Sequence, residues 1–340
     1  MDSNNGRVEY LDLLKVISAF AVIIIHVLSP VVAFYSENIT SGELIIYKTI
    51  KYFCSWAVPC FVMITGALLL NTNKEIGYKL LLRKYLLRII YAIILFGFFY
   101  AWLEIIFNEK TISLFQLPIV FYNILTNKLW DHMWYLYMLI GLYLILPILK
   151  GFIRNVRDSD FIFILIVLFI SNSILPWVTS LFNISLGIQI QTASIYIFYT
   201  LIGYYLSINK KINKKLSLIL IFIPLVFDFL ISCNICKWTN YSNEFSYNSP
   251  MVVMMAIGIF SLIQNYTKKS RLVNQIARIS FAIYLIHPLY INIVLKLLKI
   301  NPLRYNSILV VMILMIIIPI TSILTSIILY KIPVLRKYVL

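Results

Sequence analysis

The sequence predicts an all-α, polytopic membrane protein with about ten transmembrane helices. Three observations support this prediction: 61% of the 340 residues are hydrophobic, only 12% are charged, and the mean hydropathy is +0.91. A soluble domain is about half apolar and about a quarter charged. The apolar residues also form runs of about 20, the length that a helix needs to cross the hydrocarbon of a bilayer.

Short polar breaks such as NKKINKK and TKKSRLVNQIAR separate the apolar runs. The first run is too long for a removable signal peptide and lacks a small-residue cleavage site, so we expect it to be retained as a span. The predicted spans are residues 10–34, 47–71, 86–107, 132–150, 160–180, 190–208, 216–232, 250–266, 279–299 and 307–330.

Most lysines and arginines gather in alternate loops, which predicts that both termini lie in the cytoplasm. The same bias explains the net charge of +16, so that charge does not require nucleic acid as a partner. The sequence contains neither a Gly-rich phosphate loop nor zinc-ligand spacing, and we expect no metal site. Two cysteines are predicted to pack inside a span and two fall in an outer loop: Cys54, Cys60, Cys233 and Cys236.

The two longest outer loops differ in character. Residues 108–131 contain an apolar stretch broken by Pro118, which we expect to lie along the membrane interface or to re-enter the membrane. Residues 233–249 mix aromatic side chains with amides and hydroxyls. Two interpretations of this second loop remain open: it contacts sugars, or its Tyr and Trp side chains anchor it at the membrane edge.

A polar stripe follows one face of the first span. Lys15 and His26 are eleven residues apart, which is three helical turns plus roughly 20°, and about 16 Å along the axis. Asp12 falls on the same side, and ionisable groups at this depth normally face a bundle interior or a wet cavity. Either His26 only hydrogen-bonds a neighbouring helix, or it is a neutral base that takes a proton near neutral pH.

Basic residues open the third span, in the stretch KLLLRKYLLRII. Lys84 and Arg88 share a face of an α-helix, whereas Arg83 and Arg88 diverge. These residues either anchor the helix at the inner membrane surface or clamp the phosphates of a cytosolic ligand, because guanidinium groups bind phosphate bidentately.

The remaining two histidines stand at or inside apolar segments. His132 and Trp134 enter the fourth span in DHMWYLYMLIGLYLILP, and His287 precedes Pro288 in ISFAIYLIHPLYI. Proline releases a backbone carbonyl one turn earlier and can kink a helix. All three histidines of the chain therefore belong to segments that we expect in or beside the membrane.

Together these stretches resemble acyltransferase family 3, the membrane O-acyltransferases of bacterial surface carbohydrates, and in particular its small sugar-acetylating members. The family opens with an acidic residue, then Arg, ten residues and His, where this chain has Asp12, Lys15 and His26. The family stretches PxFFxxSG, HLWFLYxLIGLYLxxP and SxxxYLxHP correspond to VPCFVMITG, HMWYLYMLIGLYLILP and SFAIYLIHP. The chain departs from the family at Lys15, where Arg is usual, and in the spacing of the span-3 arginines.

The resemblance implies a single integral-membrane acyltransferase domain over residues 1–340, in a bacterial plasma membrane. It implies transfer of an acyl group, usually acetyl, from cytosolic acetyl-CoA to a hydroxyl of a surface or lipid-linked polysaccharide, without a bound cofactor. Proteins of glycan assembly would be its partners, along with the lipid bilayer.

By the same resemblance His26 acts as general base or as a transient acyl carrier, while Asp12 and Lys15 organise the donor end. Three basic residues would hold the CoA phosphates, and three further residues are candidates for the cavity: Arg83, Lys84 and Arg88; His132, Trp134 and His287. Two other functions remain open, a transporter or flippase for lipid-linked glycan and a membrane sensor without catalysis.

Overall fold

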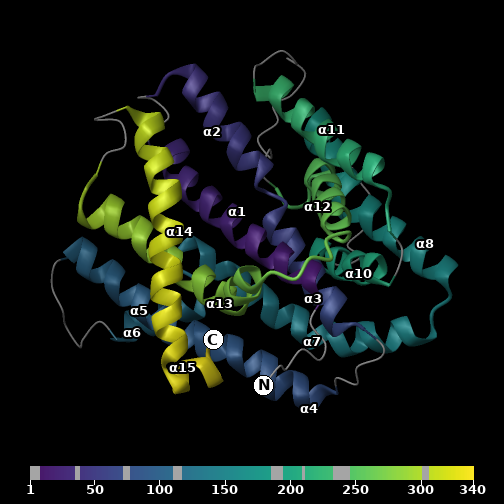
Figure 1. Cartoon of the computed structure of the whole chain (residues 1–340), viewed down its shortest axis with the longest axis horizontal. Coiled ribbons are helices and arrows are strands. Elements are labelled where there is room, and N and C mark those ends of the chain that lie inside the picture. The colour runs from purple at the N-terminus through teal and green to yellow at the C-terminus, as the bar shows by residue number, and fades with distance from the viewer. Residues whose placement is uncertain are drawn as a thin grey trace. The chain divides into compact units, whose positions relative to one another are not determined.

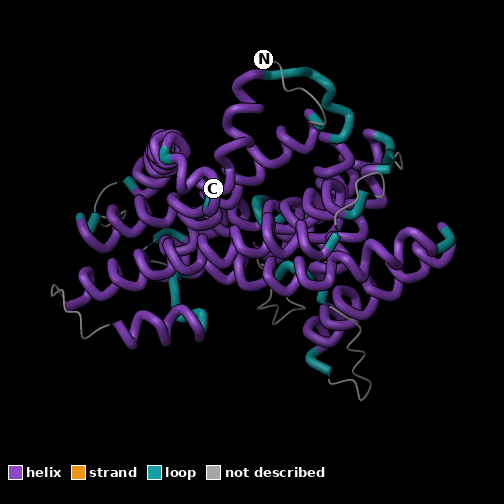
Figure 2. Tube along the Cα trace, turned by 90° about the horizontal axis from the view of Figure 1, so that it is seen from below, coloured by secondary structure: helices purple, strands orange, loops and turns teal. Residues whose placement is uncertain are grey.

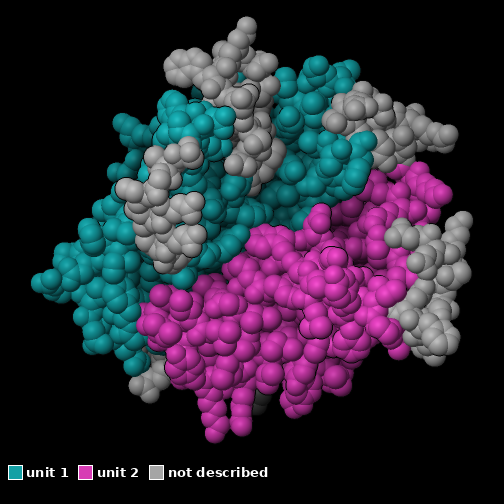
Figure 3. Space-filling view, turned by 180° about the vertical axis from the view of Figure 1, so that it is seen from behind, with its two compact units in different colours: residues 1–73, 150–278 teal, residues 74–149, 279–340 magenta. Residues whose placement is uncertain are grey.

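The described part of the chain is helical throughout. The computed structural model describes residues 8–34, 39–71, 77–109, 117–184, 194–208, 211–232, 246–300 and 306–340. No strand occurs in these ranges (Figure 2), which confirms the all-α prediction. The chain forms two compact units, residues 1–73 with 150–278 (unit 1) and residues 74–149 with 279–340 (unit 2), coloured separately in Figure 3.

A helix stands at each of the ten predicted spans. Seven helices in the described ranges are long and apolar enough to cross a membrane, and the predicted spans 190–208 and 250–266 correspond to shorter apolar helices. The chain is a membrane protein by these features, while the count of ten spans and the cytoplasmic termini stay predictions. The seven helices are Glu9–Phe34, Ser41–Leu69, Tyr78–Phe107, Asp131–Asn155, Asp158–Phe182, Arg271–Leu297 and Ser307–Lys331.

Unit 1 contains the polar first helix and the helices that pack around it. The helix α2 begins with a capping box, in which Thr40 and Glu43 satisfy each other's backbone N–H groups. The elements of unit 1 are α1 (Glu9–Phe34), α2 (Ser41–Phe53), α3 (Ala57–Leu69), α8 (Asp158–Phe169), the π-helix η5 (Ile170–Ile174), α9 (Leu175–Phe182), α10 (Ile195–Ser207), α11 (Lys214–Ser232) and α12 (Pro250–Ile263) (Figure 1).

The closest helix pair in unit 1 is α3 with α10, and two glycines make it close. A Cβ built on Gly66 would overlap the carbonyl group of Thr200, and one built on Gly203 would overlap the backbone of Met63. Small residues let the backbones of membrane helices approach one another, so that packing is gained without polar groups. The family-like stretch VPCFVMITG therefore ends in Gly66 for a packing reason.

The helix α2 packs against both α1 and α11, and α11 in turn packs against α12. Gly258 of α12 lies so near α11 that an added Cβ would be 2.7 Å from the carbonyl oxygen of Ser217. Cys54 and Cys60 are buried free thiols, as the packing prediction requires. Cys233 and Cys236 lie outside the described residues.

Unit 2 contains the basic third span and both of the remaining histidines. Its elements are α4 (Tyr78–Leu80), the π-helix η2 (Leu81–Leu86), α5 (Leu87–Glu109), α6 (Leu117–Leu125), the 3₁₀ turn η4 (Asp131–Met133), α7 (Trp134–Asn155), α13 (Arg271–Asn292), the π-helix η6 (Ile293–Leu297), α14 (Ser307–Lys331) and α15 (Pro333–Tyr338). The boundary between the units falls within α7 and within α13.

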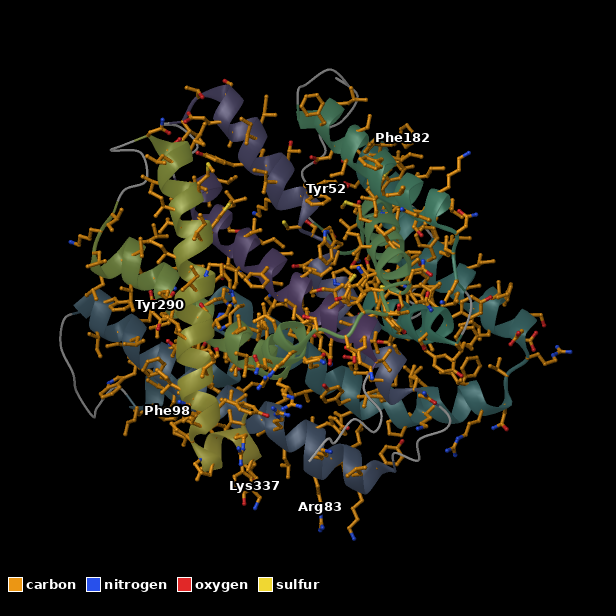
Figure 4. All side chains as sticks on the ribbon, viewed as in Figure 1. Tyr52, Arg83, Phe98, Phe182, Tyr290 and Lys337 are labelled. Carbon is orange, nitrogen blue, oxygen red and sulfur yellow. The ribbon has the colours of Figure 1, made fainter. Side chains whose placement is uncertain are left out.

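The apolar stretch around Pro118 forms the nine-residue helix α6, which packs on α5. Phe121 meets Phe98 of α5 edge to face with ring centroids 5.2 Å apart (Figure 4 labels Phe98). Val120 and Ile124 are the buried residues of α6, whereas Leu117, Ile119 and Leu125 are exposed. The helix thus has the apolar, one-sided packing that suits an interfacial segment, and its place relative to the membrane stays a prediction.

Replacing Gly66 with Ala should destabilise unit 1 by about 1–3 kcal/mol, because the new methyl overlaps the backbone of α10. Thermal unfolding in detergent, followed by tryptophan fluorescence, measures the effect. Gly141→Ala is the matched control, since nothing lies within 4 Å of a Cβ there and Ala favours a helix over Gly. Equal stability of the two variants would contradict the proposed close packing of α3 and α10.

Candidate functional site

The polar stripe predicted on the first span is present on α1 of unit 1. The ammonium group of Lys15 donates to Oδ1 of Asp12 at 3.1 Å, and Asp12 is buried to 5% exposure. Ser18, one turn further on, is fully buried. A charged pair within an apolar helix is stable only where the charges compensate each other, because either charge alone pays a large desolvation cost. The structure therefore brings Asp12 and Lys15 together as one group.

His26 is half-buried on the same helix, and a charged residue of α2 acts on it. Lys51 of α2 lies near enough for its positive charge to act on the imidazole. One turn before His26, Val22 and Ile23 are fully buried, so the ring borders the packed interior of unit 1. The pairing of an imidazole with a nearby ammonium group was not part of the sequence prediction.

The three basic residues of span 3 do not act as one group in unit 2. Arg83 and Lys84 are exposed on the π-helix η2, and Figure 4 shows Arg83 projecting away from the helices. Lys84 lies over the ring of Tyr85 at 5.7 Å. Two exposed cations at a helix mouth suit an anionic ligand or the membrane surface, so both interpretations from the sequence remain open for this pair.

Arg88 instead points into unit 2. Its Nε donates to the main-chain carbonyl of Val339 at 3.2 Å, and its guanidinium lies 5.7 Å from the ring centre of Phe281. Tyr91 meets Tyr338 edge to face at 6.4 Å, which adds a second contact between α5 and α15. In this structure, Arg88 fastens the segment 333–340 to α5, separately from Arg83 and Lys84.

The segment that Arg88 fastens carries exposed cations of its own. Arg336 and Lys337 lie in the last turn of α15, and Figure 4 shows Lys337 at the end of unit 2 from which Arg83 also projects. A side-chain hydrogen bond with Tyr338 raises the pKa of Lys337, which keeps its ammonium group charged. This end of unit 2 therefore presents positive charge from both η2 and α15.

The two histidines of unit 2 meet in its interior, although 155 residues separate them in the sequence. The ring centroids of His132 and His287 are 5.8 Å apart, and both side chains are at most 2% exposed. Tyr100 and Tyr284 surround His132 with centroid distances of 5.5 and 5.6 Å. The structure thus brings two predicted cavity residues together. Trp134, the third, is half-buried and meets Tyr135 edge to face at 6.1 Å.

Hydrogen bonds to backbone carbonyls fix this cluster. The hydroxyl of Tyr284 donates to the carbonyl of His132, and that of Tyr100 donates to the carbonyl of Leu285. Nδ1 of His287 lies 3.2 Å from the carbonyl oxygen of Ile283. A carbonyl only accepts, so this contact is a hydrogen bond when Nδ1 carries a proton. The contact fixes the orientation of the His287 ring.

An ion pair that the sequence analysis did not single out borders this cluster. Lys296 of η6 donates to both oxygens of Glu104 at 2.7 Å, and Nε1 of Trp130 donates to Glu104 at 2.8 Å. The Trp130 ring stacks on Tyr100 with centroids 4.2 Å apart. Contacts therefore run without a break from a partly exposed ion pair to the buried His132.

A second functional candidate missed by the sequence analysis lies in unit 1. Asp228 is 4% exposed near the end of α11 and is the one charged residue of that helix after Lys215. The sequence alone could have indicated this residue, because a lone carboxylate in an apolar run needs a partner. The same holds for the lysines in the apolar run of α2. In the described ranges, no group of three or more His, Cys, Asp or Glu side chains could hold a metal ion.

Comparison with known proteins matches the chain to a family model. The family model described as "Acyltransferase domain", that of acyltransferase family 3, matches residues 8–330. The chain belongs to acyltransferase family 3. The match spans both units and includes every site residue predicted from the sequence. No curated protein and no solved structure was found to match the chain. Family membership and the apolar helices together make the protein a membrane acyltransferase.

Replacing Arg88 with Ala should loosen the segment 333–340, because the variant loses the bond to the Val339 carbonyl and the contact with Phe281. We expect limited proteolysis in detergent to cut near α15 at least about fivefold faster, corresponding to a loss of about 1 kcal/mol. Arg83→Ala is the control, since Arg83 is exposed and makes no comparable contact with α15. Similar cleavage rates for both variants would refute the fastening role of Arg88.

Proposed function

We propose that this acyltransferase moves an acetyl group from cytosolic acetyl-CoA to a hydroxyl of a surface or lipid-linked polysaccharide, in the plasma membrane of a bacterium. The observation that carries the proposal is the arrangement on α1. A partly buried Asp12–Lys15 pair precedes a half-buried imidazole by three turns, in a chain that belongs to the family across residues 8–330. Such a stripe of ionisable groups in a membrane span supports a polar reaction path.

In the proposed reaction His26 accepts the proton of the acceptor hydroxyl while the oxygen attacks the thioester carbonyl. The carbon–oxygen bond forms, the carbon–sulfur bond breaks, and the imidazolium returns the proton to the departing thiolate as free CoA. In the alternative order His26 takes the acetyl group first and passes it to the hydroxyl, with CoA leaving before the acceptor reacts. Both routes give the same products.

The other candidate residues have separate proposed roles. Asp12 and Lys15 organise the donor end of the path, where Lys15 meets a phosphate or carboxylate as a point charge. Arg83 and Lys84 are the exposed cations for the phosphates of CoA, whereas Arg88 contributes by holding α15 in place. His132, Trp134 and His287 remain candidates for a polar interior in unit 2.

Replacing His26 with Ala should reduce acetyl transfer by at least about 10²-fold, the scale of general acid–base catalysis. Membranes that contain the protein receive acetyl-CoA and glycan, and both free CoA and acetylated glycan are measured. Folded protein, quantified by fluorescence-detected size exclusion, should stay near the unaltered amount. Substantial residual transfer would mean that His26 has only a packing role. Movement of unmodified glycan across the membrane, without release of CoA, would instead support the transport alternative.

Replacing Lys15 with Arg should preserve or raise the transfer rate, because Arg keeps the charge beside Asp12 and adds a planar fork for phosphate or carboxylate. Lys15→Met, which removes the charge and leaves Asp12 without its ion pair, should lower both the rate and the amount of folded protein. The same assay gives the Michaelis constant for acetyl-CoA. A severe loss of activity in the Arg variant would count against a donor contact at this position.

A further inference from the structure

The reaction needs a positive group or hydrogen-bond donor beside the thioester carbonyl, because negative charge develops on that oxygen as the hydroxyl attacks. Lys15 is the one lysine or arginine of α1, the helix that carries His26. Lys15 is about 16 Å away along the axis of α1 and already binds Asp12. Within unit 1, the cation would therefore come from another helix.

We propose that Lys51 is the cation that stabilises the oxyanion, and that Asp228 positions it; this inference rests on the proposed acetyl transfer. In unit 1, α2 packs against α1 on one side and against α11 on the other. The helix α12 also contacts both α1 and α11 but contains no ionisable residue, so α2 is the helix that can carry a charged side chain between His26 and Asp228. No role was predicted from the sequence for either Lys51 or Asp228.

The position of Lys51 on α2 supports an inward orientation. Tyr47, four residues earlier, and Cys54, three residues later, share its face and are both buried. Lys51 itself is half-buried, and its charge acts on the His26 ring. Along the chain, His26 lies eight residues before the end of α1 and Lys51 ten residues after the start of α2, so the two reach the same level of these consecutive helices.

The position of Asp228 on α11 requires a partner, because a buried carboxylate in an apolar helix is costly unless it is paired. Two helices pack closely against α11 in the described part of unit 1, α12 and α2. The helix α12 contains no ionisable residue. The cations of α2 are Lys48 and Lys51, and of these Lys51 shares the buried face of Tyr47. A bond from Asp228 to Lys51 would hold the ammonium group in place beside the imidazole.

The proposed step adds no reactant to the reaction. As the hydroxyl oxygen bonds to the carbonyl carbon, its proton passes to His26 and the carbonyl oxygen gains negative charge opposite the Lys51 ammonium. When the carbon–sulfur bond breaks, the carbonyl re-forms and the charge passes to the thiolate, which takes the proton from His26. Lys51 remains protonated throughout, and Asp228 remains ionised because Lys51 pairs with it.

The test compares purified full-length variants in lipid nanodiscs, with rates expressed per folded molecule. Lys51→Met should lower kcat for acetyl transfer by about 10²–10³-fold, the cost of losing one oxyanion donor, and should change KM for acetyl-CoA less than about twofold. Lys48→Met is the matched control on the same helix and should keep kcat within about threefold. Lys51→Arg should restore much of the rate, since the charge is kept.

The exchange of the two charges, Lys51→Asp with Asp228→Lys, separates catalysis from folding. We expect Asp228→Asn to lower the amount of folded protein, because it leaves the ammonium group without its partner. The exchange should restore folded protein while kcat stays as low as in Lys51→Met, because a carboxylate now stands beside His26. Recovery of kcat in the exchange variant, or a near-normal kcat in Lys51→Met, would overturn the inference.

The same experiment keeps this inference apart from the proposed function. If the unaltered protein releases no CoA and acetylates no glycan, the acetyl transfer itself is refuted and the role of Lys51 in it falls as well. If the unaltered protein is active and Lys51→Met matches the Lys48→Met control, the function stands and the assignment of Lys51 fails.

Discussion

The free-energy cost of placing charged side chains inside apolar helices constrains this structure more than any other contribution to its stability. An isolated ionised group at membrane depth is unstable, so each charge must find an opposite charge or a backbone group. Asp12 forms an ion pair with Lys15 of its own helix, and Glu104 forms one with Lys296, which is distant in the sequence. Arg88 donates a hydrogen bond to the carbonyl of Val339. These contacts also determine which elements pack together, because one of them connects α5 to η6 and another connects α5 to α15. Polar contacts thus specify an arrangement that apolar side chains alone leave open.

Close backbone packing complements these polar contacts. Gly66 and Gly203 let α3 and α10 approach until their backbones touch, and Gly258 does the same for α12 against α11. Because lipid tails are as apolar as leucine, burial of apolar side chains gains little inside the membrane, and close van der Waals contact supplies the stability instead. The glycine of a family-like stretch is explained by this requirement without any direct part in chemistry.

Much of this fold and part of the site follow from the sequence. The length of the apolar runs placed a helix at every predicted span, and the helical period correctly put Asp12 beside Lys15. The meeting of His132 with His287 could not be predicted, because it depends on which helices pack together rather than on spacing along one helix. The separation of Arg88 from Arg83 follows from their spacing, whereas its separation from Lys84 does not, because residues 81–86 form a π-helix and not an α-helix. Asp228 and Lys51 were visible as charges in apolar runs, yet their significance emerges only from the packing of α2 between α1 and α11.

The π-helix η2 has a consequence for how this region tolerates changes in length. Its hydrogen bonds join residues five apart instead of four, so that the turn accommodates one residue more than an α-helix would. Deleting a single residue there would let the ladder revert to regular α-helical bonding, while α5 kept its own register. Everything before the deletion, including Tyr78 and Lys79, would keep nearly the same orientation, because the α-helical turn spans about the same angle as the π-helical turn with its one extra residue. The π-helix thus absorbs one residue of length, so that a codon lost there neither redirects the residues before it nor disturbs the span behind it.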